Sequence, residues 1–345
     1  MNNADLTQHI DRLHAPGLID MHYDLGMDLF DKRRQGNVLE RDYLADMRAG
    51  GIGTCAAAIY LEDKYLPEMA LRVSLDQISR LHAATDEPGA SGSFAICKNL
   101  KHIKESRLAG KIGLVITLEG VEPLGSDPDL LRVFFELGVR AIGLTHVRRN
   151  MAGEGGVFAD TGSSPQGLTP FGRKLISDCE RMGIMVDLAH INPVGFDDIL
   201  KITDKPPIVS HSNARKYFDI ERNLSDDQIR AVGRRGGVIG VNAVLVSPVR
   251  ATATIDRYLD HVDYMVEMAG IDSVAIGFDF FENIYKGLPA EDRAALSSIN
   301  FVPGLSNHAH ARNVTADLIA RGWSDVDLEK FLYGNWLRVF KDTIS

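Results

Sequence analysis

Short apolar stretches rich in Val and Ile alternate along the chain with longer amphipathic segments. Stretches of this kind, bounded by Gly or Pro, are typical of buried parallel strands joined by crossover helices. Eight of them lie at residues 18–24, 52–60, 113–119, 140–146, 184–190, 207–212, 238–243 and 274–279. A ninth, residues 93–97, is interpreted as an accessory strand.

Helix signals fall between these predicted strands. Thr169, followed by a proline, has the residue type of an N-cap, and the amphipathic segment after it ends at Gly183. Ser225 and Gln228 have the spacing of a capping box, which predicts another helix start. Strand–helix alternation repeated eight times predicts an α/β fold, a (β/α)8 TIM-type barrel, with an open parallel sheet as the alternative.

A barrel of this type accommodates all 345 residues in one domain, residues 1–345. Two long connections interrupt the regular alternation. Residues 148–169 are polar and rich in glycine, and residues 282–307 follow the eighth predicted strand. We expect both to form loops over the mouth of the barrel.

Composition excludes several classes of partner. The net charge is -9, and phosphate recognition depends on clustered Lys and Arg, so neither a nucleic acid nor a membrane surface is expected as a partner. The three cysteines have no close spacing, which argues against a disulfide framework and a thiolate zinc cluster. The N-terminus has no apolar stretch of the kind found in signal peptides, and no run has the roughly 20 apolar residues of a membrane span. The sequence therefore favours a cytoplasmic protein.

Most of the predicted strands end in a side chain suited to metal binding or proton transfer. These side chains are His22, Asp24, Glu119, His146, His190, His211 and Asp279. The i, i+2 spacing of the first two places them on one face of an extended segment. Because active sites of such barrels lie at the C-terminal ends of the strands, we expect all seven to meet there.

Imidazole and carboxylate ligands suit zinc or a similar divalent ion, and one carboxylate can bridge two ions. Each residue alone also has a structural interpretation. Glu119 could pair with an arginine, and His190 or His211 is, taken alone, typical of a packed core histidine. Asp187 is interpreted as an acceptor that orients a ligand histidine. For His308, a capping or lid contact is preferred to metal ligation.

The candidate site residues lie within longer stretches that follow one another in this order: IDMHYDL, LEGVEPLGSDPDLLRVFFELGVRAIGLTH, GLTPFGRKLI, GIMVDLAHINP, PPIVSHSNAR, ERNLSDDQI, GGVIGVN, GFDF and YGNWLRVF. In these stretches and their order, over most of the sequence, the chain resembles the membrane dipeptidase (renal dipeptidase) family of zinc peptidases, family M19. The resemblance implies a metal-dependent hydrolase barrel that holds two divalent ions, most often Zn²⁺. By this resemblance, His22 and Asp24 bind one ion, His190 and His211 bind the other, and Glu119 bridges them.

The resemblance also implies roles toward a substrate. His146 would contact the scissile carbonyl or its oxyanion, and Arg222 would hold the C-terminal carboxylate of the substrate, since an arginine fork pairs well with a carboxylate. Asp279 would carry the proton to the leaving amine, which leaves poorly as an anion.

The sequence departs from the family pattern near the expected site. Phe281 stands where the family commonly has a second acid, and VRRNMAGEG follows His146 in place of a stretch that usually contains tryptophan. Met21 and Tyr23 replace residues that are often Gly and Asn, which is expected to change the floor of the pocket. Arg148 and Arg149, directly after the His146 strand, are interpreted as a solvated pair, with selection of acidic substrates at the mouth as the alternative expectation.

The leading hypothesis is a dipeptidase that cleaves its substrate with a metal-bridging hydroxide. Acceptance of a D-residue at the C-terminal position is implied by the resemblance alone. One alternative keeps the metals but hydrolyses a lactam, a lactone or a cyclic amide. Another is a small-peptide-binding protein without catalysis. A homodimer is implied by the resemblance alone.

Overall fold

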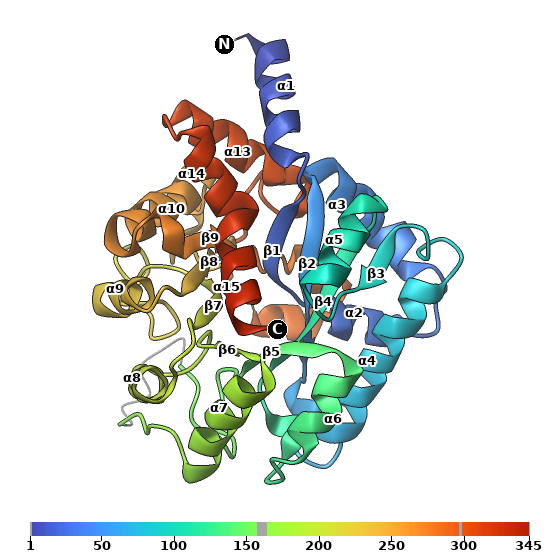
Figure 1. Ribbon diagram of the computed structural model, residues 1–345, viewed down its shortest axis with the longest axis vertical. Helices are drawn as coiled ribbons and strands as arrows, with labels where there is room; N and C mark the ends of the chain where they lie inside the picture. The colour runs from blue at the N-terminus through green and yellow to red at the C-terminus, as the bar shows by residue number, and fades with distance from the viewer. Residues whose placement is uncertain (1, 157–163, 297–298, 345) are drawn as a thin grey trace.

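The computed structural model describes residues 2–156, 164–296 and 299–344. Parallel strands form its centre in the order β1-β2-β4-β5-β6-β7-β8-β9, with helices around them (Figure 1). These strands are β1 (Leu18–Tyr23), β2 (Ile52–Tyr60), β4 (Ile112–Glu119), β5 (Val139–Gly143), β6 (Met185–Asp187), β7 (Ile208–Ser212), β8 (Val238–Val241) and β9 (Val274–Ile276). The short β3 (Phe94–Ile96) pairs with β4 outside this order. The predicted (β/α)8 barrel and its accessory strand are confirmed.

Helices surround the strands. They are α1 (Asn3–His14), α2 (Leu25–Asp31), α3 (Ala45–Gly50), α4 (Ala70–Asp86), α5 (Leu100–Leu108), α6 (Leu130–Leu137), α7 (Pro170–Met182), α8 (Pro193–Ile202), α9 (Asp226–Arg234), α10 (Ile255–Ala269), α11 (Glu282–Gly287), α12 (Ala290–Ala295), α13 (Ala311–Ala320), α14 (Asp325–Glu329) and α15 (Asn335–Thr343). Two of them, α7 and α9, begin at the predicted signals. The Thr169 side chain accepts a hydrogen bond from the backbone of α7, which ends at Gly183 with φ 72°. Ser225 and Gln228 form the predicted capping box.

A side chain joins the two end strands of the sheet. Within the described residues no backbone ladder pairs β9 with β1. The fully buried carboxylate of Asp20, on β1, instead accepts a hydrogen bond from the backbone N–H of Phe278, just beyond β9, at 3.0 Å. The contact places the ends of β1 and β9 side by side.

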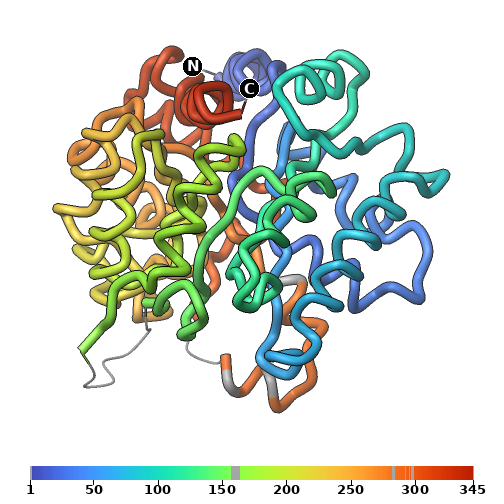
Figure 2. Tube along the Cα trace, turned by 60° about the horizontal axis from the view of Figure 1, so that its bottom comes forward, coloured from blue at the N-terminus to red at the C-terminus, as the bar shows by residue number. Residues whose placement is uncertain are grey.

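Helix α15 covers one end of the barrel. Trp336 and Phe340 stack at 4.6 Å between ring centroids, and they belong to a hydrophobic cluster with strand residues such as Ile19 and Val238. Figure 2 shows α15 (red) at one end of the barrel and the segment of α11 and α12 (orange) at the other. The end opposite α15 is therefore open to loops that follow the strands.

The predicted mouth loops are only partly described. Residues 157–163 of the predicted loop 148–169 lie outside the described residues. Before this gap, Gly156 donates a backbone hydrogen bond to the carbonyl oxygen of His190 at 2.6 Å, so the segment lies against the loop after β6. Residues 282–307 contain the short helices α11 and α12. The one-domain organisation stays a prediction.

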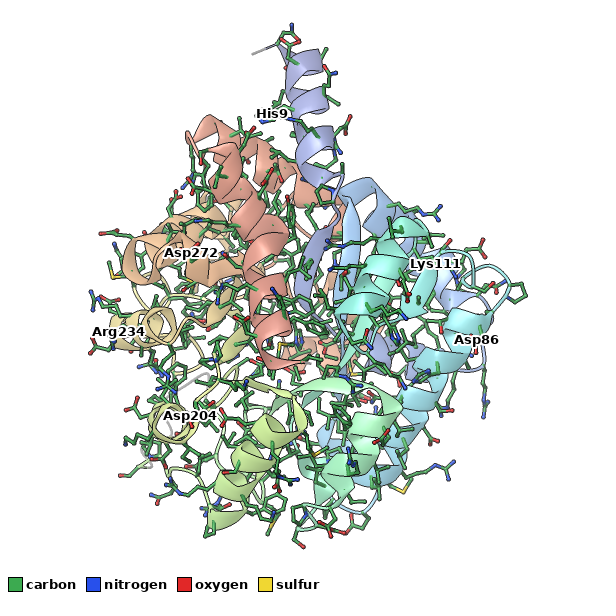
Figure 3. The ribbon with its side chains drawn as sticks, in the orientation of Figure 1. His9, Asp86, Lys111, Asp204, Arg234 and Asp272 are labelled. Carbon is green, nitrogen blue, oxygen red and sulfur yellow. The ribbon has the colours of Figure 1, made fainter. Side chains whose placement is uncertain are left out.

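Charged side chains lie around the outside of the helical ring. Asp86, Asp204, Arg234 and Asp272 are exposed and point away from the barrel (Figure 3). In the part of the chain that the structure describes, every helix is too short or too polar to cross a bilayer.

We expect Trp336→Ala to lower the free energy of unfolding by about 3–5 kcal/mol, because it leaves a cavity beneath the barrel. Trp336 is 1% exposed. Val326→Ala, at a side chain that is 62% exposed, is the control and should change stability by less than about 0.5 kcal/mol. Urea unfolding measures both variants. Equal stability of the two would contradict a sealing role for α15.

Candidate metal centre

The structure brings the predicted site residues together at the open end of the barrel. Glu119, at the end of β4, lies at their centre. Its Oε1 is 2.9 Å from Nε2 of His190 and 3.4 Å from Nε2 of His211. Its Oε2 is 3.8 Å from Nε2 of His22. The two carboxylate oxygens thus face different histidines.

Two further carboxylates lie on the Oε2 side of Glu119. The His22 Nε2 atom is 3.5 Å from Oδ1 of Asp24 and 3.8 Å from Oδ1 of Asp279. Asp24 occupies the N-cap position of α2, yet its side chain makes no capping hydrogen bond. Its carboxylate is therefore free to face the cluster.

The expected positions at strand ends are correct for some residues and wrong for others. His22 and His211 lie in β1 and β7, and Glu119 ends β4. The strands predicted to end at His146, His190 and Asp279 stop three residues earlier, at Gly143, Asp187 and Ile276. His190 and Asp279 have positive φ angles of 64° and 56°. A left-handed backbone leaves the extended path, so these side chains enter the site from turns.

Several polar atoms of the cluster are buried and lack a hydrogen-bond partner. These are Nε2 of His22, Oδ1 of Asp24, Nδ1 of His146 and Nδ1 of His190. The Nε2 atoms of His190 and His211 also face each other at 2.9 Å. A buried polar group without a partner costs about 1–3 kcal/mol, so the donor set fits a bound cation better than a self-contained network.

Burial and like charge change the ionisation of the carboxyl groups. Burial, with the charges of Asp24 and Asp279, raises the pKa of Glu119 to about 8. Burial and the charge of Asp24 raise the pKa of Asp279 to about 7. Burial alone would lower the pKa of His22, but the negative charges of Glu119 and of the nearby Asp24 outweigh it and raise this pKa to about 10. The carboxylates of the cluster therefore favour a positive charge beside them, and in the absence of a metal ion a protonated His22 provides it.

The other imidazoles behave in the opposite way. Burial lowers the pKa of His190 and of His211 well below its usual value, and the charge of Arg222 adds to both shifts. Burial and the charge of Arg148 lower the pKa of His146 in the same direction. All three imidazoles are therefore neutral near pH 7, which is the form that ligates metals or shares one proton in a hydrogen bond.

Hydrogen bonds beneath the cluster hold one of these rings. Ser210 Oγ lies 2.8 Å from Nδ1 of His211. Asp187 accepts from the backbone N–H groups of Ser210 and Ala189 at 2.9 and 3.0 Å. The sequence predicts Asp187 to be an acceptor that orients a ligand histidine. These two bonds are to the backbone beside His190 and His211, so Asp187 holds these residues through their main chain.

Arg222 lies next to the cluster and is 3% exposed. Its Nη2 donates to the carbonyl oxygen of His211 at 2.6 Å, whereas its Nε and Nη1 are buried without partners. A buried guanidinium with open donors is suited to an anionic group of a ligand. The ring of His146 lies 4.3 Å from that of His190 and 4.6 Å from that of Tyr60.

The departures from the family pattern have different consequences. Arg148 is engaged by Glu122 at 2.7 Å and Asp63 at 2.9 Å, which argues against the expectation that it selects acidic substrates. Tyr23 and Met21 are buried in hydrophobic clusters, so they pack into the scaffold.

The sequence interpretation missed Asn242, which follows β8 and donates to Oδ2 of Asp279 at 2.8 Å. The rule that polar residues after strands face the site would have identified it. It also missed Asp20 as the buried partner of His308. Nε2 of His308 lies 2.8 Å from Oδ2 of Asp20.

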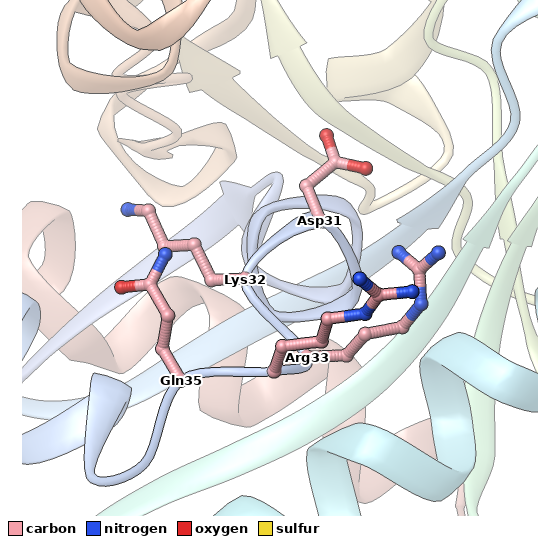
Figure 4. Close-up of a pocket in the computed structure, with 5 residues that line it drawn as sticks. Asp31, Lys32, Arg33 and Gln35 are labelled. Atoms are coloured by element: carbon pink, nitrogen blue, oxygen red, sulfur yellow. The ribbon is translucent and has the colours of Figure 1, made fainter.

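A surface hollow of about 370 Å³ lies apart from this cluster, lined by residues 31–35 (Figure 4). None of these residues belongs to the cluster around Glu119. Nζ of Lys32 forms salt bridges with Oδ2 of Asp28 at 2.7 Å and with Oδ2 of Asp42 at 3.1 Å. The hollow follows the turn after α2 and contributes nothing to the candidate metal centre.

Comparison with known proteins agrees with this geometry. An uncharacterized dipeptidase of Schizosaccharomyces pombe is 31% identical over 249 residues, which make up 69% of this chain and 60% of the yeast protein. The chain therefore aligns with about 60% of the length of this curated relative.

Solved structures share the fold. A metallo peptidase from Rhodobacter sphaeroides, liganded with a phosphinate mimic of the dipeptide L-Ala-D-Ala, has a TM-score of 0.82 at 23% identity, covering 95% of this chain and 99% of its own. The dipeptidase AC, a metallo peptidase of family M19, has a TM-score of 0.83 at 25% identity, covering 95% and 98%. A probable dipeptidase, PvdM, from Pseudomonas aeruginosa has a TM-score of 0.81 at 22% identity, covering 99% of both chains.

The sequence profile of the membrane dipeptidase family, peptidase family M19, matches residues 8–345. Because this match extends over nearly the whole chain, the protein belongs to the membrane dipeptidase family.

Proposed function

We propose that this protein is a metal-dependent dipeptidase whose two divalent ions, most readily Zn²⁺, are held on either side of Glu119. The observation that carries the proposal is that the two carboxylate oxygens of Glu119 face different histidines. One oxygen faces His190 and His211, and the other faces His22. Asp24 lies beside His22. The side chains thus form two groups of ligands, His22 with Asp24 and His190 with His211, and both groups share the Glu119 carboxylate.

The chain supplies the remaining functions through its own side chains. Two bound ions would polarise the scissile carbonyl and lower the pKa of a water molecule. His146 would donate a hydrogen bond to the carbonyl oxygen, a role supported by its neutral ring and its buried Nδ1, which lacks a partner. Arg222 binds the C-terminal carboxylate of the substrate with its open Nε and Nη1 donors.

Asp279 is the group that passes a proton to the leaving amine. Its pKa of about 7 lets it take up and release a proton near neutral pH. Asn242 holds its Oδ2 atom, and its Oδ1 faces His22 at 3.8 Å. The proton is therefore carried at Oδ1, on the side of the cluster.

A very short peptide suits this arrangement, because Arg222 lies directly beside His211 and leaves little length between the carboxylate clamp and the metal centre. The dipeptide mimic in the Rhodobacter structure supports the same class of substrate and motivates tests with a D-residue at the C-terminal position. The cytoplasmic location and the homodimer stay predictions.

Dipeptide hydrolysis tests the proposal directly. We expect cleavage of L,L or L,D dipeptides to be lost after treatment with a chelator and restored by zinc, cobalt or manganese. Glu119→Gln should lower kcat/KM by at least about 100-fold, since even outer partners of metal ligands contribute 10–100-fold. Glu136→Gln, at a side chain that is 67% exposed, is the control.

A panel of lactams, lactones and cyclic amides separates this proposal from another metal-dependent hydrolase. Turnover of such a compound with no cleavage of any dipeptide would reject the dipeptidase. Metal content well below one equivalent, with no restoration by added ions, would reject the metal centre.

Cation binding at the cluster is expected to release protons. In the metal-free protein the pKa of Glu119 is raised to about 8 and that of His22 to about 10, so the pair of side chains holds a proton at pH 7 that ligation removes. The apparent affinity should therefore rise as the pH increases from 6 to 9. Calorimetry in buffers of different ionisation enthalpy measures the protons released, and Glu119→Gln should release fewer. A heat that does not depend on the buffer would contradict this ionisation.

We expect Arg222→Ala to lower kcat/KM for dipeptides by about 30-fold or more, mainly through KM, because truncating one partner of a buried charge pair costs about 2 kcal/mol or more. C-terminally amidated analogues should change by less than about 3-fold, since they lack the carboxylate partner. Arg215→Ala removes a side chain that donates to Asn223 and Glu221 on the same loop, and should affect both substrates alike. The carboxylate clamp is refuted if Arg222→Ala also affects both alike.

A further inference from the structure

A buried hydrogen bond between a histidine and a carboxylate lies beside the candidate metal centre and takes no part in the proposed chemistry. Nε2 of His308 is 2.8 Å from Oδ2 of Asp20, and the two residues are 2% and 0% exposed. His308 begins a short helical turn, residues His308–His310, that follows the segment of α11 and α12. The pair thus joins a late segment of the chain to the first strand.

The Asp20 carboxylate connects three parts of the site. Its Oδ1 accepts from the backbone N–H of His22 at 3.2 Å and from that of Phe278 at 3.0 Å. Its Oδ2 accepts from His308. Phe278 immediately precedes Asp279, whose backbone is left-handed with φ 56°. The Asp20 carboxylate therefore holds the backbone of His22, a proposed metal ligand, and the backbone of Phe278, the residue before the proposed proton carrier.

His308 is held firmly enough to fix that carboxylate. The rings of Tyr23 and Phe280 meet it edge-on, with centroids 4.8 and 5.2 Å away. A Cβ on Gly50 would lie 1.9 Å from the carbonyl oxygen of His308, so α3 packs directly against its backbone. These contacts hold the backbone and the ring of His308 on the side of Asp20.

We propose that Asp20 and His308 are positioning residues that set the separation between His22 and Asp279. These two residues lie on either side of the seam of the barrel, the junction between β9 and β1. The inference rests on the proposed function, in which His22 ligates a metal and Asp279 carries a proton. The seam needs such a device because no backbone ladder within the described chain joins β9 to β1. The side-chain carboxylate replaces the missing ladder.

Metal binding at this pair is the weaker interpretation. Asp20, Cys55 and His308 have donor atoms within 4.8 Å of one another. However, both oxygens of Asp20 already accept hydrogen bonds, so a cation there would have to displace these bonds. A positioning role uses the contacts as they stand.

Three variants test the proposal. His308→Phe keeps an aromatic ring among Tyr23 and Phe280 but removes the donor to Asp20, whereas His308→Gln keeps a donor. His14→Phe is the matched control, because His14 is also a buried histidine that is bonded through both ring nitrogens, but its partners are Gly50 and Thr315 instead of Asp20.

We expect His308→Phe to lower kcat about 10–100-fold, since small misplacements of reacting groups have effects of this size. KM for dipeptides and metal content should stay within about 3-fold of the parent protein, as should kcat for His308→Gln and His14→Phe. Amide hydrogen exchange at His22 and Phe278 should be faster in His308→Phe than in His14→Phe. Should His308→Phe not fold, His308→Asn, whose donor is too short to reach Asp20, takes its place.

Parental kcat and exchange in His308→Phe would overturn the proposal, as would an equal loss of kcat in His14→Phe. Equal impairment of His308→Gln and His308→Phe would also overturn it, because a donor would then not matter. A parent protein that cleaves no dipeptide rejects the proposed function, and the exchange comparison still decides whether His308 positions the seam.

Discussion

The Glu119 carboxylate is buried at the end of a strand, among histidines and within the field of two other acids. Burial and these like charges raise its pKa to about 8, so its ionised form depends on positive charge nearby. Two cations placed at its two oxygens would satisfy this requirement and the unpartnered atoms of His22, Asp24 and His190 together. The roles proposed for Arg222 and Asp279 follow from it, since both surround the same carboxylate.

The barrel provides the rigidity that such a centre needs. Parallel strands deliver His22, Glu119 and His211 from separate parts of the sequence to one end, while α15 fills the other end with Trp336 and Phe340. Polar groups can then gather at the open end without weakening the apolar core. The chemistry and the main source of stability are spatially separate, which allows loops to change without loss of the fold.

The seam between β9 and β1 shows how a side chain can complete a backbone architecture. Asp20 accepts from two backbone N–H groups on either side of the seam and from His308. This arrangement links the segment after α12 to the backbone of His22 in the candidate metal centre. Sequence changes in that segment can therefore act on His22 and Asp279 without contacting a substrate.

Much of this could be predicted from the sequence, because apolar periodicity reports burial and the polar residues after the strands mark the open end. The barrel, the capping box at Ser225 and the gathering of the predicted site residues all followed from such patterns. The exact ends of three strands did not, since the left-handed backbone at His190 and Asp279 has no signature in apolar periodicity. The pairing of Asp20 with His308 depends on contacts between distant segments, which one sequence does not reveal.

Anomalous diffraction from crystals of the protein loaded with zinc tests the central claim most directly. The account predicts two peaks about 3.5–4 Å apart, with one Glu119 oxygen bound to each ion. One ion should lie by His22 and Asp24, and the other by His190 and His211. A single ion, or a Glu119 side chain turned away from both histidine groups, would contradict it.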